Sequence, residues 1–148
     1  MTIRYFSHQD QHDPMNGQKI EQRVHLSELL HSRRSNAPFI AEMTGDNGFQ
    51  LTAGIGASLC CVQHSLADGS QPYLMAVSPH RPISRGCVEF LSANTLTPIA
   101  ARYVISFDEL EKIALHFFDT GERSDIVAWQ ELDPRALVED TVAAQAGN

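Results

Sequence analysis

The sequence predicts an α+β fold: one domain over residues 1–148, with a mainly antiparallel sheet, two packing helices and a closing C-terminal strand. Six short strand candidates follow one another between residues 38 and 100, and turn residues separate them. Amphipathic helical patterns flank them at residues 24–34 and 107–120. Short links join antiparallel neighbours, because a parallel crossover needs about a dozen residues or more. A meander is therefore the expected topology.

The N-terminal part, residues 1–22, has the least defined pattern of the chain. Residues 3–6 can form a short edge strand, whereas residues 7–17 are polar and contain Pro14 and the turn pair Asn16-Gly17. We expect a solvated loop there. Leu26, Leu29 and Leu30 then fall at the i, i+3, i+4 spacing of a helix with one buried face.

The strand candidates share β-type composition and turn boundaries; they are residues 38–44, 49–55, 58–64, 72–77, 88–93 and 96–100. In the second, apolar residues from Phe49 to Ile55 alternate with Gln50, Thr52 and Gly54, which predicts one face on a core and one toward solvent. Residues 73–77 are apolar throughout, so we place them nearer the centre of the sheet. The two helices are expected to cover one face and to leave the other open.

The second helix has clear start and stop signals. Ser106 and Glu109 have the spacing of a capping box, and Gly121 suits a left-handed C-cap. Its apolar stripe consists of Phe107, Leu110, Ile113, Ala114, Phe117 and Phe118. Residues 126–131 form the closing strand, and residues 134–148 form either a flexible tail or a short helix. Trp129 can be a packing anchor of the sheet or an exposed partner contact.

The charge distribution favours a basic protein partner. The net charge is −7, of which −5 falls in residues 119–148. Such a field argues against nucleic acid or an anionic membrane as partner. Acidic residues that serve only solubility are the alternative. The odd number of cysteines, three, and the absence of a signal-peptide pattern lead us to expect a cytoplasmic protein.

No stretch has the spacing of a catalytic, cofactor or metal site, so we expect no enzyme activity, no cofactor and no metal. His8 and His12 lack a third ligand, and Gly54-x-Gly56 precedes a strand candidate rather than a helix. The alternative is a small enzyme or ligand-binding domain that uses the open sheet face, with His64, His80 or Cys87. A subunit that dimerises through an edge strand is a further alternative.

The segment LEKIALHFFDTGERSDIVAWQEL resembles the C-terminal signature of immunity family 1 of bacterial polymorphic toxin systems. The matching positions are Ala114, Phe117, Phe118, Gly121, Glu122, Arg123, Ile126, Trp129, Glu131 and Leu132. The order of elements is similar over residues 24–132, including the "L.aGiG" pattern. Ser124 stands where the family usually has proline, which affects the expected geometry of the link.

The resemblance implies a cytosolic antitoxin that blocks one cognate toxin domain, and some members neutralise nucleic-acid deaminases. A deaminase or nuclease would be inhibited by stoichiometric occlusion of its active site or substrate cleft. The motif residues Phe117, Phe118, Gly121, Trp129 and Glu131 are expected to be structural. Partner contacts are expected at acidic residues on predicted edges and turns: Glu42, Asp46, Asp68, Glu89, Glu122 and Asp125.

Overall fold

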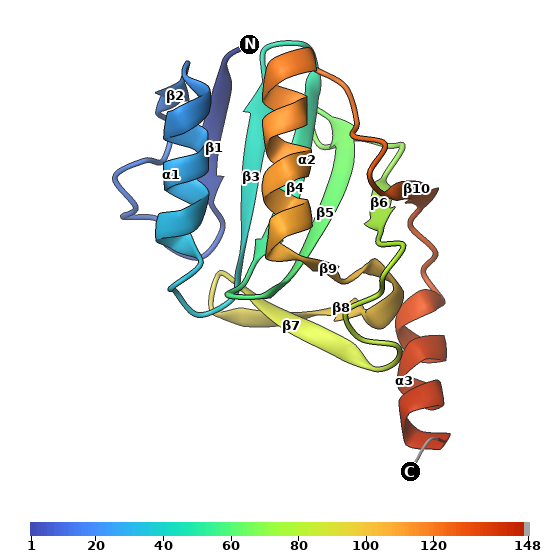
Figure 1. Cartoon of the computed structure of the whole chain (residues 1–148). Helices are drawn as coiled ribbons and strands as arrows, with labels where there is room; N and C mark the ends of the chain where they lie inside the picture. The colour runs from blue at the N-terminus through green and yellow to red at the C-terminus, as the bar shows by residue number, and fades with distance from the viewer. Residues whose placement is uncertain (147–148) are drawn as a thin grey trace.

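One mainly antiparallel sheet forms the centre of the computed structural model, which describes residues 1–146 (Figure 1). Across the sheet the strands are β10 (Ala128–Glu131), β6 (Leu74–Val77), β5 (Leu59–Leu66), β4 (Phe49–Ile55), β3 (Phe39–Gly45), β1 (Ile3–Ser7) and β2 (Lys19–Ile20). The strands β3 to β6 form the expected meander. The predicted α+β class is confirmed.

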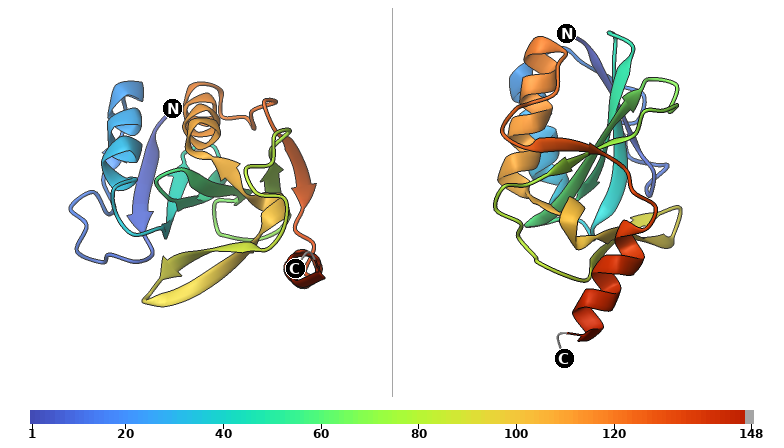
Figure 2. Two further views of the ribbon diagram at one scale, coloured as in Figure 1. Left: turned by 60° about the horizontal axis from the view of Figure 1, so that its bottom comes forward. Right: turned by 90° about the vertical axis from the view of Figure 1, so that its right-hand side faces the viewer.

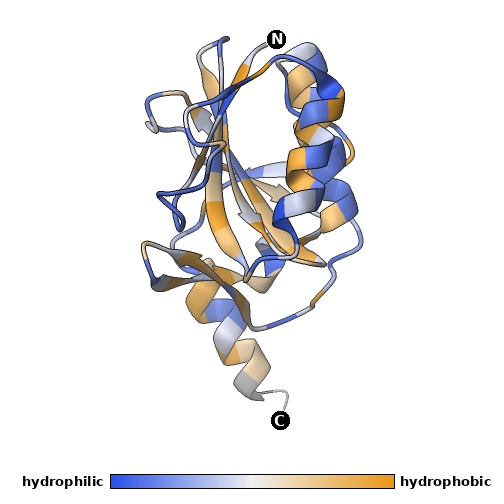
Figure 3. Ribbon diagram, turned by 90° about the vertical axis from the view of Figure 1, so that its left-hand side faces the viewer, coloured by the Kyte–Doolittle hydropathy of each residue, from blue (hydrophilic) through white to orange (hydrophobic). Residues whose placement is uncertain are grey.

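Helices α1 (Arg23–Arg33) and α2 (Phe107–Thr120) lie side by side on one face of the sheet (Figures 1 and 2). Both helices carry hydrophobic as well as hydrophilic residues, as Figure 3 shows by colour. Alternate residues of the strands meet them; the largest fully buried side chains include Tyr5, Met43, Leu51, Ile55, Leu110 and Phe117. The main core therefore lies between the sheet and these two helices, as the periodicity predicts.

Helix α2 begins and ends as its sequence predicts. The Ser106 hydroxyl accepts a hydrogen bond from the Glu109 amide at 3.1 Å, and the Glu109 carboxylate accepts one from the Ser106 amide at 2.9 Å. At the other end Gly121 is left-handed, with φ 75°, and its amide donates to the Phe117 carbonyl. These caps fix where the following link leaves the helix.

The second face of the sheet is partly covered, which differs from the open face that we expected. A hairpin of β7 (Cys87–Ser92) and β8 (Thr95–Ala100) crosses it on the side away from α1 and α2 (Figure 2). Phe90 is completely buried there against Ile40 and Cys61. The hairpin meets β3 in one parallel pairing, Phe39 with Leu91, instead of extending the meander.

The C-terminal elements cover the same face farther along. A short 3-10 helix η1 (Ala101–Tyr103) and β9 (Ile105–Ser106) lead into α2, and α3 (Ala136–Ala146) packs against η1 and β8. Arg102 holds α3 through a salt bridge to Asp140 at 2.8 Å. Among residues 1–146, no helix combines the length and hydrophobicity that a bilayer crossing requires.

Strand β6 does not lie at the centre of the sheet, because only β10 separates it from the edge. Its apolar sequence reflects two covered faces instead. Ala76 belongs to the main core, whereas Met75 packs with Ala100 and Tyr103 on the other side. The place that we predicted for residues 73–77, nearer the centre of the sheet, was therefore wrong.

The N-terminal segment is built into the fold. Strand β1 pairs with both β2 and β3, so it is an inner strand rather than the edge that we expected. The loop after it is tied to α1, because Arg33 donates hydrogen bonds to the buried Asp13 carboxylate at 2.7 and 2.6 Å. Burial alone would raise the pKa of Asp13, but these bonds outweigh it and hold the pKa below its usual value.

Candidate functional site

A groove with a volume of about 640 Å³ lies at one end of the sheet. Its floor comes from β4, β5 and β6, and its wall from the link between α2 and β10. The apolar lining consists of Phe49, Leu66, Pro72, Leu74, Val127 and Trp129. We call it the end groove. A groove of this size, which combines apolar walls with polar groups, is typical of a binding site.

His64 lies in the end groove and is only 7% exposed. It sits on the helix-facing side of β5, opposite Leu51 in β4, where a core residue would be expected. Its ring stacks on Phe49 at a centroid distance of 5.0 Å and meets Phe117 and Trp129 edge-on, each at 6.2 Å. Three aromatic rings therefore hold a polar ring at the border between the core and the groove.

The ring nitrogens of His64 have no hydrogen-bond partner among residues 1–146, and neither is sealed from solvent. They are therefore open to a ligand in the end groove. Burial, together with the smaller effect of the positive charge of Arg123, lowers the pKa of His64 to about 4. At neutral pH the imidazole is thus uncharged and offers one acceptor and one N–H donor.

Two hydrogen bonds hold the wall of the end groove in place. The Asn47 side-chain amide donates to the Gly121 carbonyl at 2.9 Å, and the Trp129 indole N–H donates to the Ser124 carbonyl at 2.7 Å. Ser124 is buried, and its hydroxyl accepts a hydrogen bond from the Ile126 amide at 3.3 Å. The link thus follows a fixed path between helix and strand.

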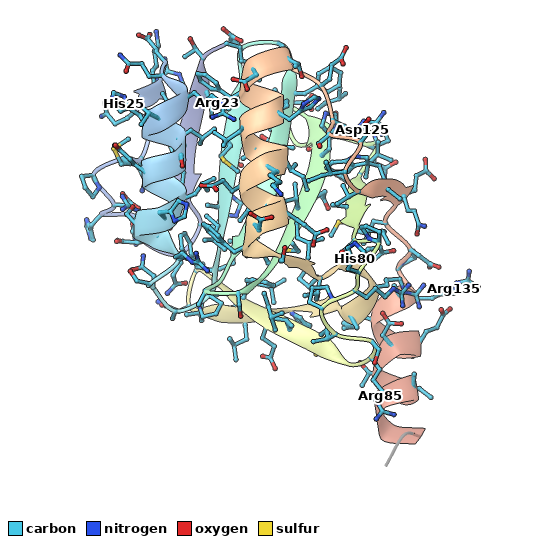
Figure 4. All side chains as sticks on the ribbon, viewed as in Figure 1. Arg23, His25, His80, Arg85, Asp125 and Arg135 are labelled. Atoms are coloured by element: carbon cyan, nitrogen blue, oxygen red, sulfur yellow. The ribbon has the colours of Figure 1, made fainter. Side chains whose placement is uncertain are left out.

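Glu122, Arg123 and Asp125 project from this link into or along the end groove. All three are exposed, and none forms an ion pair within the described part of the chain. Figure 4 shows Asp125 on the link beside β10. Two carboxylates and one guanidinium thus border a largely apolar space.

Of the six acidic residues predicted as contacts, four lie at this end of the sheet. Glu122 and Asp125 line the end groove, whereas Asp46 and Asp68 lie in the β3–β4 and β5–β6 turns. Hydrogen bonds from Ser70 lower the pKa of the Asp68 carboxyl. These four carboxylates belong to one region of the molecule.

The other two predicted contact residues, Glu42 and Glu89, lie elsewhere on the molecule. Glu42 is on the second face of the sheet, with its carboxylate 3.3 Å from the imidazole of His8. Glu89 is exposed on β7, which lies toward the opposite end of the sheet. A single contact surface therefore does not contain all six residues, and whether any of them touches a partner stays a prediction.

The motif residues occupy different environments. Phe117 is fully buried and Phe118 is 7% exposed, while Gly121 provides the left-handed turn. Trp129 does two things: it packs against the main core and lines the end groove. Glu131 is exposed on the edge strand β10, with no side-chain hydrogen bond inside residues 1–146. A structural role is therefore visible for four of the five.

The residues of the alternative catalytic hypothesis are not brought together. His80 lies in a separate hollow beside Lys112 and Ile126, toward the other end of α2 (Figure 4). Cys87 is exposed at the start of β7 and lines neither hollow. Within residues 1–146 no cluster of three potential metal ligands is found.

The sequence-based reasoning missed Phe49 and Arg123 as groove residues and treated His64 only as an alternative. One signal was available for His64. The alternation of β5 places it on the core side with Cys60 and Val62, where a polar ring needs a partner. The residues expected on the core side of the neighbouring strand candidate 49–55 are all apolar and offer no such partner.

No family model matches this sequence, and no curated protein matches it. The features of this chain that bear on function are the chemistry of the end groove, the charge of its surroundings and the pattern of residues 110–132.

Proposed function

We propose that this protein is an immunity protein that binds a cognate secreted bacterial toxin domain and neutralises it by stoichiometric occlusion, without a reaction or cofactor of its own. The observation that carries this proposal is the end groove. It offers an unpartnered buried imidazole and aromatic walls beside the carboxylates of Glu122 and Asp125. The resemblance of residues 110–132 to the immunity signature supports the class of partner.

The groups in the end groove are suited to anchoring a partner. Protein interfaces owe most of their affinity to a few well-packed anchors, which are often aromatic or arginine side chains in preformed pockets. Phe49 and Trp129 provide such walls, and the hydrogen-bonded link supplies a fixed rim. The nearby turns with Asp46 and Asp68 extend the surface beyond the groove.

The charge of the protein favours a basic partner. Toxins that act on nucleic acid, whether deaminases or nucleases, need positively charged substrate clefts. A protein with net charge −7 is attracted to such a cleft, and the attraction raises the association rate at low salt. The end of the sheet that carries Asp46, Asp68, Glu122 and Asp125 would then cover the substrate cleft of the toxin and keep nucleic acid out of it.

The decisive experiment is a titration against the toxin domain encoded beside this gene, with toxin activity and calorimetric binding as readouts. We expect complete inhibition at a 1:1 ratio, nanomolar or tighter affinity, and an association rate that falls with added salt. The absence of nanomolar binding to any adjacent toxin domain would overturn the proposal.

Charge-neutralising variants locate the binding face. Glu122→Gln/Asp125→Asn should slow association more than Glu42→Gln/Glu89→Gln, because only the first pair borders the end groove. Glu21→Gln/Glu28→Gln is a matched control, since both glutamates are exposed in or just before α1, away from the groove. Equal effects of the three pairs would show that net charge alone drives association.

A small-ligand-binding domain is the second candidate, and one observation favours it. The volume of the end groove, about 640 Å³, lies within the usual range of ligand sites, roughly 300 to 1,000 Å³. This site differs from the one that we expected, because it lies beside the link and not on the open sheet face. A metabolite that raises the melting temperature through the groove, without any protein partner, would favour this function.

A further inference from the structure

We propose that the end groove receives an arginine side chain of the basic partner, with its guanidinium against the aromatic walls and its N–H groups shared between Glu122, Asp125 and His64. This inference rests on the proposed function for the identity of the partner. The chemistry of the groove itself can be tested with small probes.

The aromatic walls favour a planar cation. Phe49 is 36% exposed and Trp129 is half-buried, so each presents part of its ring surface to the groove. Guanidinium groups stack on aromatic faces and are less strongly hydrated than ammonium groups. A long side chain with a planar charged end therefore suits these walls better than lysine or an apolar residue.

The charges at the rim have the sign that a cation requires. The carboxylates of Glu122 and Asp125 outnumber the single guanidinium of Arg123, and none of the three is paired within residues 1–146. Asp68 in the neighbouring β5–β6 turn adds a further negative charge at this end. An anionic ligand would pair with Arg123 only at the cost of approaching these carboxylates.

His64 supplies the polar contact deeper in the groove. It lines the groove and is 93% removed from solvent, and its ring nitrogens have no hydrogen-bond partner within residues 1–146. An uncharged imidazole accepts a hydrogen bond from a guanidinium N–H, whereas an imidazolium would repel it. Burial keeps the pKa of His64 near 4, so the accepting form is present at neutral pH.

Trp129 provides the assay, because it is the only tryptophan of the chain and it lines the groove. Its fluorescence can be followed while the full-length protein is titrated with the N-acetyl amides of arginine, lysine and glutamate. We expect a saturable change with the arginine probe, at a dissociation constant of about 1 mM, and binding at least tenfold weaker for lysine. The glutamate probe should give no saturation.

Variants test the named contacts. Glu122→Gln/Asp125→Asn should weaken the arginine probe about tenfold, and the control pair Glu21→Gln/Glu28→Gln should leave it unchanged. His64→Phe keeps an aromatic ring but removes the acceptor, and should weaken the probe about threefold. We call the Glu122→Gln/Asp125→Asn protein the rim variant. The inference would be overturned if the native protein bound the glutamate probe as tightly as the arginine probe. It would also be overturned if the rim variant and its control bound the arginine probe equally well.

The same variants separate this inference from the proposed function. If the rim variant loses the arginine probe but the native protein inhibits no toxin, the groove chemistry stands and the immunity function fails. If a protein with all three substitutions still neutralises its toxin with unchanged affinity, the immunity function stands and the arginine site is refuted.

Discussion

We expect this protein to lose stability between neutral and mildly acidic pH, and replacing His64 should remove most of that loss. Burial lowers the pKa of His64 from 6.5 to about 4 in the folded state, so the folded protein binds the proton less readily than the unfolded chain. Stability is therefore fully present above pH 6.5 and declines as the pH falls toward 4. At about 1.36 kcal/mol per pKa unit, the expected loss between pH 7 and pH 4.5 is on the order of 2 kcal/mol.

Urea unfolding at these two pH values, followed by the fluorescence of Trp129, measures the loss directly. The free energy of unfolding of His64→Phe should change much less than that of the native protein, while His80→Phe at an exposed site serves as the control. Asp13 and Asp140 do not obscure the result, because their pKa values lie below 3.8 and they destabilise the fold only at lower pH. An equal loss in native protein and His64→Phe would refute the reasoning.

Three further substitutions test the packing and the caps. Phe117→Ala should lower the free energy of unfolding by about 3 to 5 kcal/mol, since the ring is fully buried; urea denaturation measures this. Arg33→Gln leaves the buried Asp13 carboxylate without its partner and should cost about 3 kcal/mol, whereas adding Asp13→Asn should recover part of the loss. Ser106→Ala removes the helix cap shared with Glu109 and should lower the thermal midpoint, with a cost of about 1 kcal/mol.

Local patterns were sufficient to predict the elements of the fold. The strand predicted at residues 49–55 has the bounds of β4, and the capping box at Ser106 and the stop at Gly121 bound α2 as expected. The predicted solvent face of β4 was wrong, because Gln50 and Gly54 are buried, whereas Phe49 is exposed. Each of these features depends on neighbours within a few residues. Such local features can be predicted from the sequence, because the side chains that form the sequence pattern also determine the local backbone conformation.

Long-range pairing could not be predicted in the same way. Nothing near β1 indicates that it inserts beside β3, about 40 residues away, and nothing in β7 indicates that Phe90 crosses to the far face of the sheet. The end groove also depends on contacts between residues that are far apart in the sequence. It forms only because Phe49, His64 and Trp129 come from three separate strands, and because the link carrying Arg123 passes over them. The acidic character of the region was predictable, but its concave shape was not.

The two hydrogen bonds that fasten the α2–β10 link have a consequence for evolution and for affinity. The Gly121 and Ser124 carbonyls are held through Asn47 and Trp129, so the backbone path does not depend on the side chains of residues 122, 123 and 125. These three positions can change to suit another partner while the loop keeps its shape. The entropic cost of ordering this loop on binding is also small, because the loop is already ordered in the folded protein.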